Sequence, residues 1–302
     1  MAKPIRNVGA SVRARLQTLA RERQQPLDLL LVRYALERFL YRLSRSQFGG
    51  RFALKGAMLL TTWFDEPHRP TRDLDLLGFG DPAADLMLAV FREICATQVE
   101  DDGLIFDLDG LRVDQIREEL AYGGLRLRTT AQLAGARIPI TIDIGFGDAV
   151  EPGLEEIDLP VLLGMPAPHL RAYPQETVIA EKFQAMVMLG RANSRMKDFY
   201  DIWVLSKQYE FEGDRLPRAI AATFRRRGTE IPTTPPDALT TEFARDDAKA
   251  RQWTAFVANL TLPPAPFEEV LADLARFLMP QAETARQRAQ PPEGPAAASS
   301  EP

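Results

Sequence analysis

The segment 72–77 alternates charged and apolar side chains, and this alternation is the strongest constraint on the fold. Its sequence is Arg-Asp-Leu-Asp-Leu-Leu. Successive side chains of a β-strand point to opposite faces, so Asp73 and Asp75 share one face while Leu74 and Leu76 pack behind them. The segment therefore predicts a short strand with two carboxylates on one side. Such carboxylates repel each other unless a cation lies between them, and their oxygen atoms suit Mg²⁺.

The rest of the chain predicts an α+β fold. Strand-like stretches follow at 104–108, 111–116, 120–129 and 138–144. Helical periodicity predicts helices before, between and after the strands, at 11–24, 26–44, 82–96, 174–189, 196–208, 214–227 and 267–279. Residues 52–62 are apolar and predict a loop that leads into a helix. Helices that flank and interleave with strands in this way are typical of α+β proteins.

Composition excludes several classes of protein. The 302 residues are 45% hydrophobic, which is enough for a sizeable core without disulfides. Cys95 is the single cysteine, so no disulfide scaffold is possible within the chain. No stretch approaches the roughly 20 apolar residues of a membrane span, and the first 25 residues carry no apolar signal region. We therefore expect a soluble, cytoplasmic protein with no membrane partner.

Charge is distributed unevenly along the chain. Residues 1–55 contain twelve Lys and Arg against three Asp and Glu, a net charge of +9 in a protein whose total is −5. A basic end of this kind suits a polyanion such as nucleic acid. The same arginines could instead lie on solvated helix faces and pair with the acidic remainder. Charge alone leaves both interpretations open.

Two further features concern the chemistry of a site. Asp143 is the lone acid of the apolar segment 138–144, and burying such a charge is costly unless it is paired or binds metal. Lys55-Gly56-Ala57 predicts a helix start at which backbone N–H groups can approach an anion. The alternative for Gly56 is a helix-start glycine that binds no ligand.

Two downstream segments complete the set of motifs. Residues 173–183 read Tyr-Pro-Gln-Glu-Thr-Val-Ile-Ala-Glu-Lys-Phe, and residues 195–202 read Arg-Met-Lys-Asp-Phe-Tyr-Asp-Ile. On a helix, Asp198 and Asp201 lie three residues apart on one face. Together with the strand carboxylates, these motifs resemble the AbiEii/AbiGii toxin family of the nucleotidyltransferase superfamily typified by DNA polymerase β. The resemblance runs from about residue 54 to residue 205.

The resemblance implies a mixed nucleotidyltransferase sheet flanked by helices, with a helical C-terminal part. On this basis we expect a basic helical segment at 1–50 and a sheet core at 51–165. A helical domain at 166–280 would complete the active-site cleft. Residues 281–302 have almost no apolar bulk and predict a disordered tail.

The implied function is that of a toxin in a toxin–antitoxin or phage-defence pair, with a cognate antitoxin encoded by a neighbouring gene. Such a toxin transfers a nucleoside monophosphate from an NTP to an RNA in a Mg²⁺-dependent reaction with a two-metal mechanism. The MenT toxins of mycobacteria, which this chain resembles, act on the 3′ end of tRNA and stop translation. Two alternatives stay open: a protein or small-molecule acceptor, or a non-catalytic nucleotide- or RNA-binding module. Ala57 stands where the superfamily usually has Ser.

The resemblance also assigns roles to residues. It implies that Asp73 and Asp75 bind metal and that Asp143 completes the metal site. From the helical half, Lys182 would contact the nucleotide phosphates, and Asp198 or Asp201 would complete the catalytic set. Further implied nucleotide-binding residues are Lys55, Gly56, Arg72 and Lys197. For Lys182 and Asp201, a silent surface salt bridge is the alternative.

Thr71 is the implied regulatory residue. It lies two positions before Asp73, where related toxins carry a Ser or Thr that a kinase-like antitoxin can phosphorylate. A phosphate there would compete for Mg²⁺ and repel an incoming triphosphate. Alternatively, the Thr71 hydroxyl only bonds to the local backbone.

Overall fold

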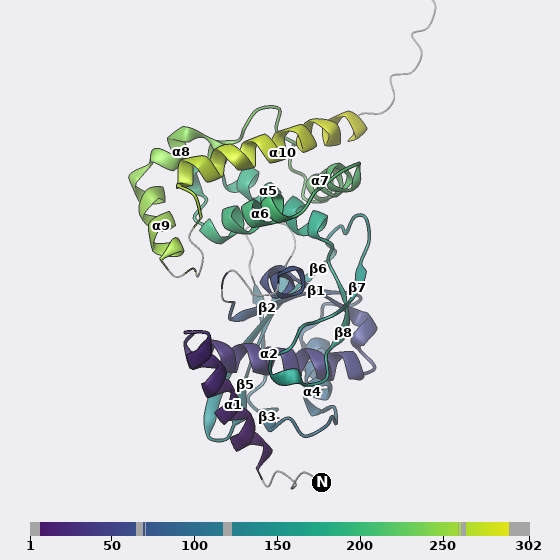
Figure 1. The fold of residues 1–302 in the computed structure, drawn as a ribbon. Coiled ribbons are helices and arrows are strands. Elements are labelled where there is room, and N and C mark those ends of the chain that lie inside the picture. Colours follow the sequence, from purple (N-terminus) through teal and green to yellow (C-terminus); the bar gives the residue numbers. More distant parts are fainter. Residues whose placement is uncertain are drawn as a thin grey trace, which may run out of the picture. The chain divides into compact units, whose positions relative to one another are not determined.

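The structure is a computed structural model that describes residues 7–64, 69, 71–116, 123–258, 260 and 264–289. It divides into two compact units, which Figure 1 shows together. The sheet unit consists mainly of the described residues up to Asp148 and of Gly153–Pro174. The helical unit consists mainly of Ala149–Pro152 and of the chain from Gln175 onward. Each unit is treated by itself below.

A single mixed β-sheet forms the centre of the sheet unit. Its strands are β1 (Phe52–Lys55), β2 (Asp73–Gly78), β3 (Leu104–Phe106), β4 (Arg112–Ile116), β5 (Gly124–Leu133), β6 (Ala136–Phe146), β7 (Glu155–Asp158) and β8 (His169–Ala172). The strand order is β3-β5-β6-β2-β1-β8-β7, and β4 pairs with β5. The pairs β2–β6 and β1–β8 are parallel, and the other pairs are antiparallel. The central strands β6, β2 and β1 are those that carry the predicted site.

One face of the sheet is apolar and covered by helices. The unit contains α1 (Val8–Glu22), α2 (Leu27–Arg45), α3 (Leu60–Trp63) and α4 (Ala84–Ala96). Phe91 of α4 stacks on Phe39 of α2 and meets the edge of Phe52 from β1. Because Phe52 and Leu54 point to the same side of β1, α2 and α4 cover this face. The alternate residues of β1, β2 and β6, including the acidic ones, therefore point to the opposite face.

Two arginines of the basic N-terminal segment lie inside this unit. Arg38 and Arg42 of α2 are only 1% and 6% exposed. The Arg38 Nε lies 3.3 Å from Asp102 Oδ2, and Arg42 Nη1 lies 2.5 Å from the same oxygen. A buried charge of this kind must be paired, and Asp102 supplies the partner. The net charge of residues 1–55 therefore overstates the basic surface that a polyanion could contact.

The helical unit packs around aromatic side chains. Its helices are α5 (Gln175–Leu189), α6 (Met196–Gln208), α7 (Arg215–Arg226), α8 (Thr241–Arg245), α9 (Asp247–Val257) and α10 (Phe267–Ala289). Phe183 of α5 contacts Phe224 of α7, and Phe199 of α6 contacts Phe243 and Phe267. These contacts join α5 and α6, which carry the predicted Lys and Asp residues, to the rest of the unit.

Most of the predicted elements are confirmed, and two need correction. The strand predicted at 72–77 is β2, and the helices predicted at 174–189 and 196–208 are α5 and α6. Residues 52–55 are not loop but strand β1, because this apolar segment pairs with both β2 and β8. The tail predicted from residue 281 is helical up to Ala289, because Ala282 and Ala285 are fully buried at helical spacing. Residues 290–302 lie outside the described residues.

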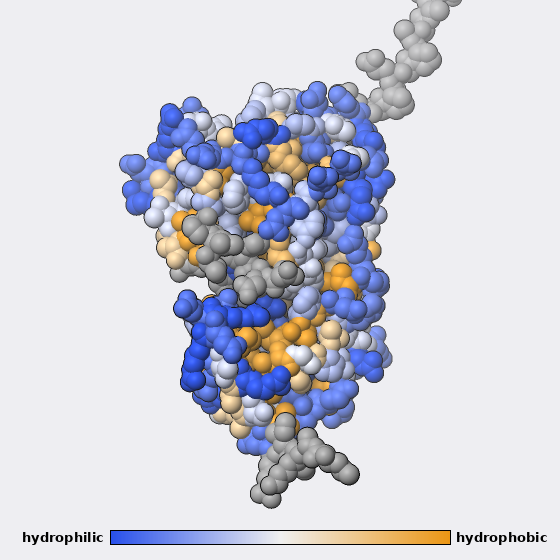
Figure 2. Space-filling view, in the orientation of Figure 1, coloured by the Kyte–Doolittle hydropathy of each residue, from blue (hydrophilic) through white to orange (hydrophobic). Residues whose placement is uncertain are grey.

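The face of the protein that Figure 2 shows is mainly polar. On the face that Figure 2 shows, hydrophilic residues cover most of each unit and hydrophobic residues gather in smaller areas. Within the described parts of the chain, no helix combines the length and the apolar character that crossing a membrane requires.

Candidate active site

A row of charged residues crosses four neighbouring strands of the sheet. Lys55 on β1 is opposite Asp75 on β2, Asp75 is opposite Asp143 on β6, and Asp143 is opposite Arg126 on β5. Residues that are opposite each other in adjacent strands point to the same face. All four side chains therefore lie on the face opposite to α2 and α4, with the two acidic residues flanked by the two basic ones.

Asp73 extends this row by one step along β2. It lies two residues before Asp75, so its side chain has the same orientation, and it is exposed. The preceding residues are also fixed by local contacts. The Thr71 hydroxyl donates a 3.1 Å hydrogen bond to the Asp73 carbonyl oxygen, and exposed Arg72 lies 2.5 Å from Asp28 at the start of α2. The predicted metal ligands and the predicted regulatory residue are thus neighbours in space.

Gly56 is required by its close approach to Asp75. Its backbone has a φ of +72°, and a Cβ atom at this position would lie 2.0 Å from Asp75 Oδ2. Only glycine combines that backbone conformation with the necessary space. Gly56 therefore allows the turn that follows β1 to lie directly against the carboxylate of Asp75.

Asp143 is held by a two-pronged ion pair with Arg126. The Arg126 Nε donates to Asp143 Oδ1 at 2.7 Å, and Nη2 donates to Oδ2 at 2.6 Å. These hydrogen bonds raise the pKa of Arg126; partial burial opposes the rise, and the charges of Asp143, Asp73 and Asp75 add to it. Arg126 is therefore an electrostatic partner of all three acidic residues. Sequence analysis missed it, because its place beside Asp143 depends on the register of β5 against β6.

A second ion pair, also missed by sequence analysis, lies at the other end of the row. The Lys55 Nζ is 2.5 Å from Asp148 Oδ2, which also accepts a 2.9 Å hydrogen bond from the Tyr173 hydroxyl. The ammonium group lies 5.4 Å from the centre of the Tyr173 ring. Asp148 lies two residues after the end of β6, and its place after a strand that bears an acid was the only available signal. This cluster fixes the position of Lys55.

The acidic residues suit a hard divalent cation. Mg²⁺ in proteins is commonly held by one or two carboxylates, with water and substrate phosphates completing its shell. Asp73 and Asp75 provide two such groups on one face. Over the residues that the structure describes, no group of three or more His, Cys, Asp or Glu side chains could hold a metal ion unaided. Asp73 and Asp75 therefore fit a cation whose other positions are filled by water or by a substrate phosphate.

In the helical unit, Lys182 lies between two buried carboxylates. Its Nζ is 2.5 Å from Asp198 Oδ1 and 2.9 Å from Asp201 Oδ2. The three side chains are 14%, 7% and 1% exposed, respectively. The structure thus brings together the three residues predicted on α5 and α6, in a buried cluster rather than a surface salt bridge. Lys197, the neighbouring predicted residue, is exposed.

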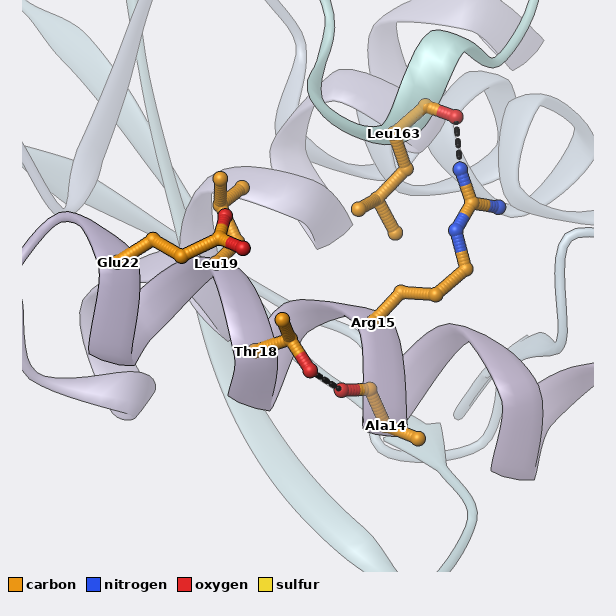
Figure 3. A pocket seen from close by; sticks show the side chains of 6 residues that line it. All are labelled: Ala14, Arg15, Thr18, Leu19, Glu22 and Leu163. Carbon is orange, nitrogen blue, oxygen red and sulfur yellow. Dashed lines mark hydrogen bonds between the residues drawn. The ribbon is translucent and has the colours of Figure 1, made fainter.

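A shallow pocket on the sheet unit contains none of the predicted residues. Its volume is about 350 Å³, and it is formed by α1 and Leu163. Figure 3 shows Arg15 reaching the Leu163 carbonyl oxygen, to which it donates a hydrogen bond, while Thr18 bonds to the Ala14 carbonyl oxygen. The charged row and this pocket are separate features.

The family of the chain follows from a comparison with models of known families. The model described as nucleotidyl transferase AbiEii toxin, type IV TA system, matches residues 38–273. The chain belongs to the AbiEii family. It is by family a nucleotidyltransferase toxin of a type IV toxin–antitoxin system, which implies an antitoxin partner. Every predicted site residue of this AbiEii protein, from Lys55 to Asp201, lies within the matched range.

Solved structures include two from Helicobacter pylori that are similar to this AbiEii protein. One is described as a candidate nucleotidyltransferase; it is 17% identical, with a TM-score of 0.45, over 86% of this chain and 96% of the other. The other is JHP933, which is 17% identical, with a TM-score of 0.44, over 86% of this chain and 93% of the other. No curated protein matches the sequence.

Proposed function

We propose that this AbiEii protein transfers a nucleoside monophosphate from an NTP to the 3′ end of tRNA, in a Mg²⁺-dependent reaction that blocks translation. The observation that carries the proposal is the charged row, in which carboxylates suited to Mg²⁺ lie between basic groups suited to phosphates. A nucleotidyltransferase needs both kinds of group on one surface. Among the described residues of the sheet unit, only the charged row combines carboxylates and basic groups with the motifs of the family.

In this proposal, Asp73 and Asp75 hold the cation, and Asp143 is the third carboxylate beside them. When bound, one Mg²⁺ would lower the pKa of the attacking hydroxyl, and a second would stabilise the leaving pyrophosphate. Lys55, held by Asp148 and Tyr173, presents its ammonium group toward the phosphates as a compact point charge. The backbone at Gly56, pressed against Asp75, keeps that carboxylate in place.

We assign nucleotide contacts to further residues by their charge and exposure. Lys197 is exposed and suits phosphate binding, whereas Arg72, although exposed, would have to leave its ion pair with Asp28 of α2 to reach a phosphate. Lys182 is the proposed phosphate contact of the helical unit, and Asp198 or Asp201, whose carboxylates hold its ammonium group, is proposed to complete the catalytic set.

An RNA acceptor is supported by the basic character of α1. This helix contains three arginines and one glutamate, and its Arg15 and Arg21 are exposed. Basic side chains bind an RNA stem through its phosphates and its shape, without reading bases. A small-molecule acceptor would not need such a helix.

The test is a transfer assay with purified protein, Mg²⁺, total tRNA and each labelled NTP in turn. We expect label in tRNA with at least one NTP, and none when the tRNA 3′ ends have been destroyed by periodate. An Asp73→Asn/Asp75→Asn protein should be inactive. Asp114→Asn is the matched control, because Asp114 is a half-exposed strand carboxylate that pairs with Arg128 outside the row. Label in protein, or in periodate-treated tRNA, would overturn the proposed acceptor.

We also propose that Thr71 is a site at which a negative charge switches the enzyme off. Its hydroxyl bonds to the Asp73 backbone, so a phosphate there lies beside the two proposed cation ligands. A Thr71→Glu protein should lose nucleotide transfer, whereas Thr71→Val should retain most of it. Full activity of the glutamate variant would contradict this role.

A further inference from the structure

The ion pair between Arg126 and Asp143 has a consequence for cation binding. Arg126 contacts both oxygens of Asp143, at 2.7 and 2.6 Å. When a planar guanidinium contacts both oxygens of a carboxylate, it occupies the directions from which those oxygens would best bind a cation. Asp143 in this arrangement is therefore a poor additional ligand for a cation at Asp73 and Asp75, although it is opposite Asp75 in the sheet.

The same ion pair reduces the repulsion among the acidic residues of the charged row. Three acidic residues, Asp73, Asp75 and Asp143, lie on one face of two adjacent strands. Like charges at such positions destabilise a sheet. Arg126 is a permanent cation, because its guanidinium does not lose its proton at physiological pH. While the pair is closed, it therefore neutralises one of the three acidic groups at any physiological pH.

The ion pair between Arg126 and Asp143 is partly exposed to solvent, so it can open. The Arg126 side chain is 38% exposed and that of Asp143 is 24% exposed, unlike the pairs of Arg38 and Arg42 with Asp102 in the core. A partly exposed pair can exchange its partner for solvent or for another ion at modest cost. Phosphate oxygens are suitable alternative partners for a guanidinium fork.

We propose that Arg126 is a latch on Asp143: it withholds this carboxylate from the divalent cation until the fork opens. In this role Arg126 is a positioning residue, which acts through Asp143 and sets how many carboxylates the cation meets. The proposal rests on the proposed function, in which Asp73 and Asp75 hold the cation. A negatively charged phosphate that draws Arg126 away would release Asp143 for the third ligand position.

The test measures Mn²⁺ binding to the full chain without nucleotide, by electron paramagnetic resonance of the free ion. We expect Arg126→Gln to bind Mn²⁺ about 3- to 10-fold more tightly than the wild type, because the latch is gone. Arg126→Lys keeps the charge but can occupy one oxygen at a time, so its affinity should lie between the two. The gain should disappear in Arg126→Gln/Asp143→Asn. Asp143→Asn alone should bind Mn²⁺ more weakly than the wild type, because the charge of Arg126, which Asp143 no longer neutralises, then opposes a cation at Asp73 and Asp75.

Arg128→Gln is the matched control. Arg128 lies two residues further along β5, on the same face, but its carboxylate partner is Asp114 on β4. Its removal takes away the same charge without releasing Asp143, so its effect on Mn²⁺ affinity should be smaller than that of Arg126→Gln. Equal effects of the two variants, or wild-type affinity in Arg126→Lys, would show that charge alone acts and would overturn the latch.

Two other results separate failure of the latch from failure of the proposed function. If the wild type binds no Mn²⁺, or if Asp73→Asn/Asp75→Asn binds Mn²⁺ as tightly as the wild type does, the proposed cation site is wrong. The proposed role of Arg126 is then wrong as well. If that double variant loses binding while Arg126→Gln binds as the wild type does, only the latch is wrong. Should Arg126→Gln fail to fold, Arg126→Lys still decides, because wild-type Mn²⁺ affinity in this variant contradicts the latch.

Discussion

Replacing Gly56 by alanine tests the link between the turn after β1 and the carboxylate of Asp75. Two effects combine at this position. The backbone φ of +72° is unfavourable for alanine, at a cost of about 1–2 kcal/mol. The new methyl group would also lie 2.0 Å from Asp75 Oδ2 and 2.7 Å from its Cγ, so the side chain of Asp75 must move.

The size of this movement sets the expected loss of activity. Contacts of a Cβ atom shorter than 3.0 Å are essentially never seen, so Oδ2 must retreat by at least 1.0 Å from its present 2.0 Å. A displacement of about 1 Å in a positioned catalytic group can reduce the rate about 100-fold. We therefore expect Gly56→Ala to reduce nucleotide transfer by about this factor.

Gly135→Ala separates strain from displacement. Gly135 lies in the turn between β5 and β6 with a φ of +80°, and no atom lies within 4 Å of the position its Cβ would take. Urea unfolding should show a loss of about 1–2 kcal/mol in the free energy of unfolding for this control, and its transfer activity should stay close to that of the wild type.

The transfer rate and the free energy of unfolding are measured for both variants under the same conditions. A Gly56→Ala protein with wild-type activity, or with no more loss than Gly135→Ala, would refute the reasoning. It would mean that Asp75 either is not displaced or does not act in the reaction. A crystal structure of the variant would show which.

Three further predictions concern stability and reactivity. Lys182→Met should lower the free energy of unfolding by about 3–5 kcal/mol because it removes the cation that two buried carboxylates contact. Lys207→Met, which removes a half-exposed cation, should lower it by about 1 kcal/mol or less. Similar losses would contradict the buried cluster. The hydrogen bond from Lys207 lowers the pKa of Asp273, with Trp203 and a neighbouring arginine adding to the effect, so Asp273 stabilises the fold above its ordinary pKa and loses this effect as the pH falls. Asp273→Asn should therefore have a lower free energy of unfolding than the wild type at pH 7, and urea unfolding should show this difference becoming smaller toward pH 3. A difference that does not change with pH would contradict a stabilising role for the Asp273 charge. Burial raises the pKa of Cys95 to about 12, so its thiol should react with Ellman's reagent at pH 8 only after unfolding, and rapid reaction in the folded protein would contradict this.

Local pattern alone was sufficient for two of the elements that carry the site, β2 and α6, but not for β1, which it predicted as a loop. Alternation in 72–77 placed Asp73 and Asp75 on one face of a strand, and helical spacing placed Asp198 and Asp201 on one face of α6. Such periodicities are properties of the backbone itself and are readable without a partner. The order and identity of the motifs also indicated the family that the comparison established.

The partners of these residues were decided by contacts between distant segments. Arg126 meets Asp143 because of the register between β5 and β6, and Lys55 meets Asp148 across 93 positions of sequence. Composition likewise counted Arg38 and Arg42 as part of a basic surface, although Asp102 draws them into the core.

The physical reason for this division is that alternation needs only the local chain, whereas pairing and burial need the fold. A strand fixes which side chains share a face, but the neighbouring strand fixes which charge stands opposite. Burial then decides whether a charge must have a partner, since an unpaired charge in the interior is too costly to keep. The sequence by itself thus determined the acidic face of β2, and only the tertiary structure decided that Arg126 and Lys55 would stand beside it.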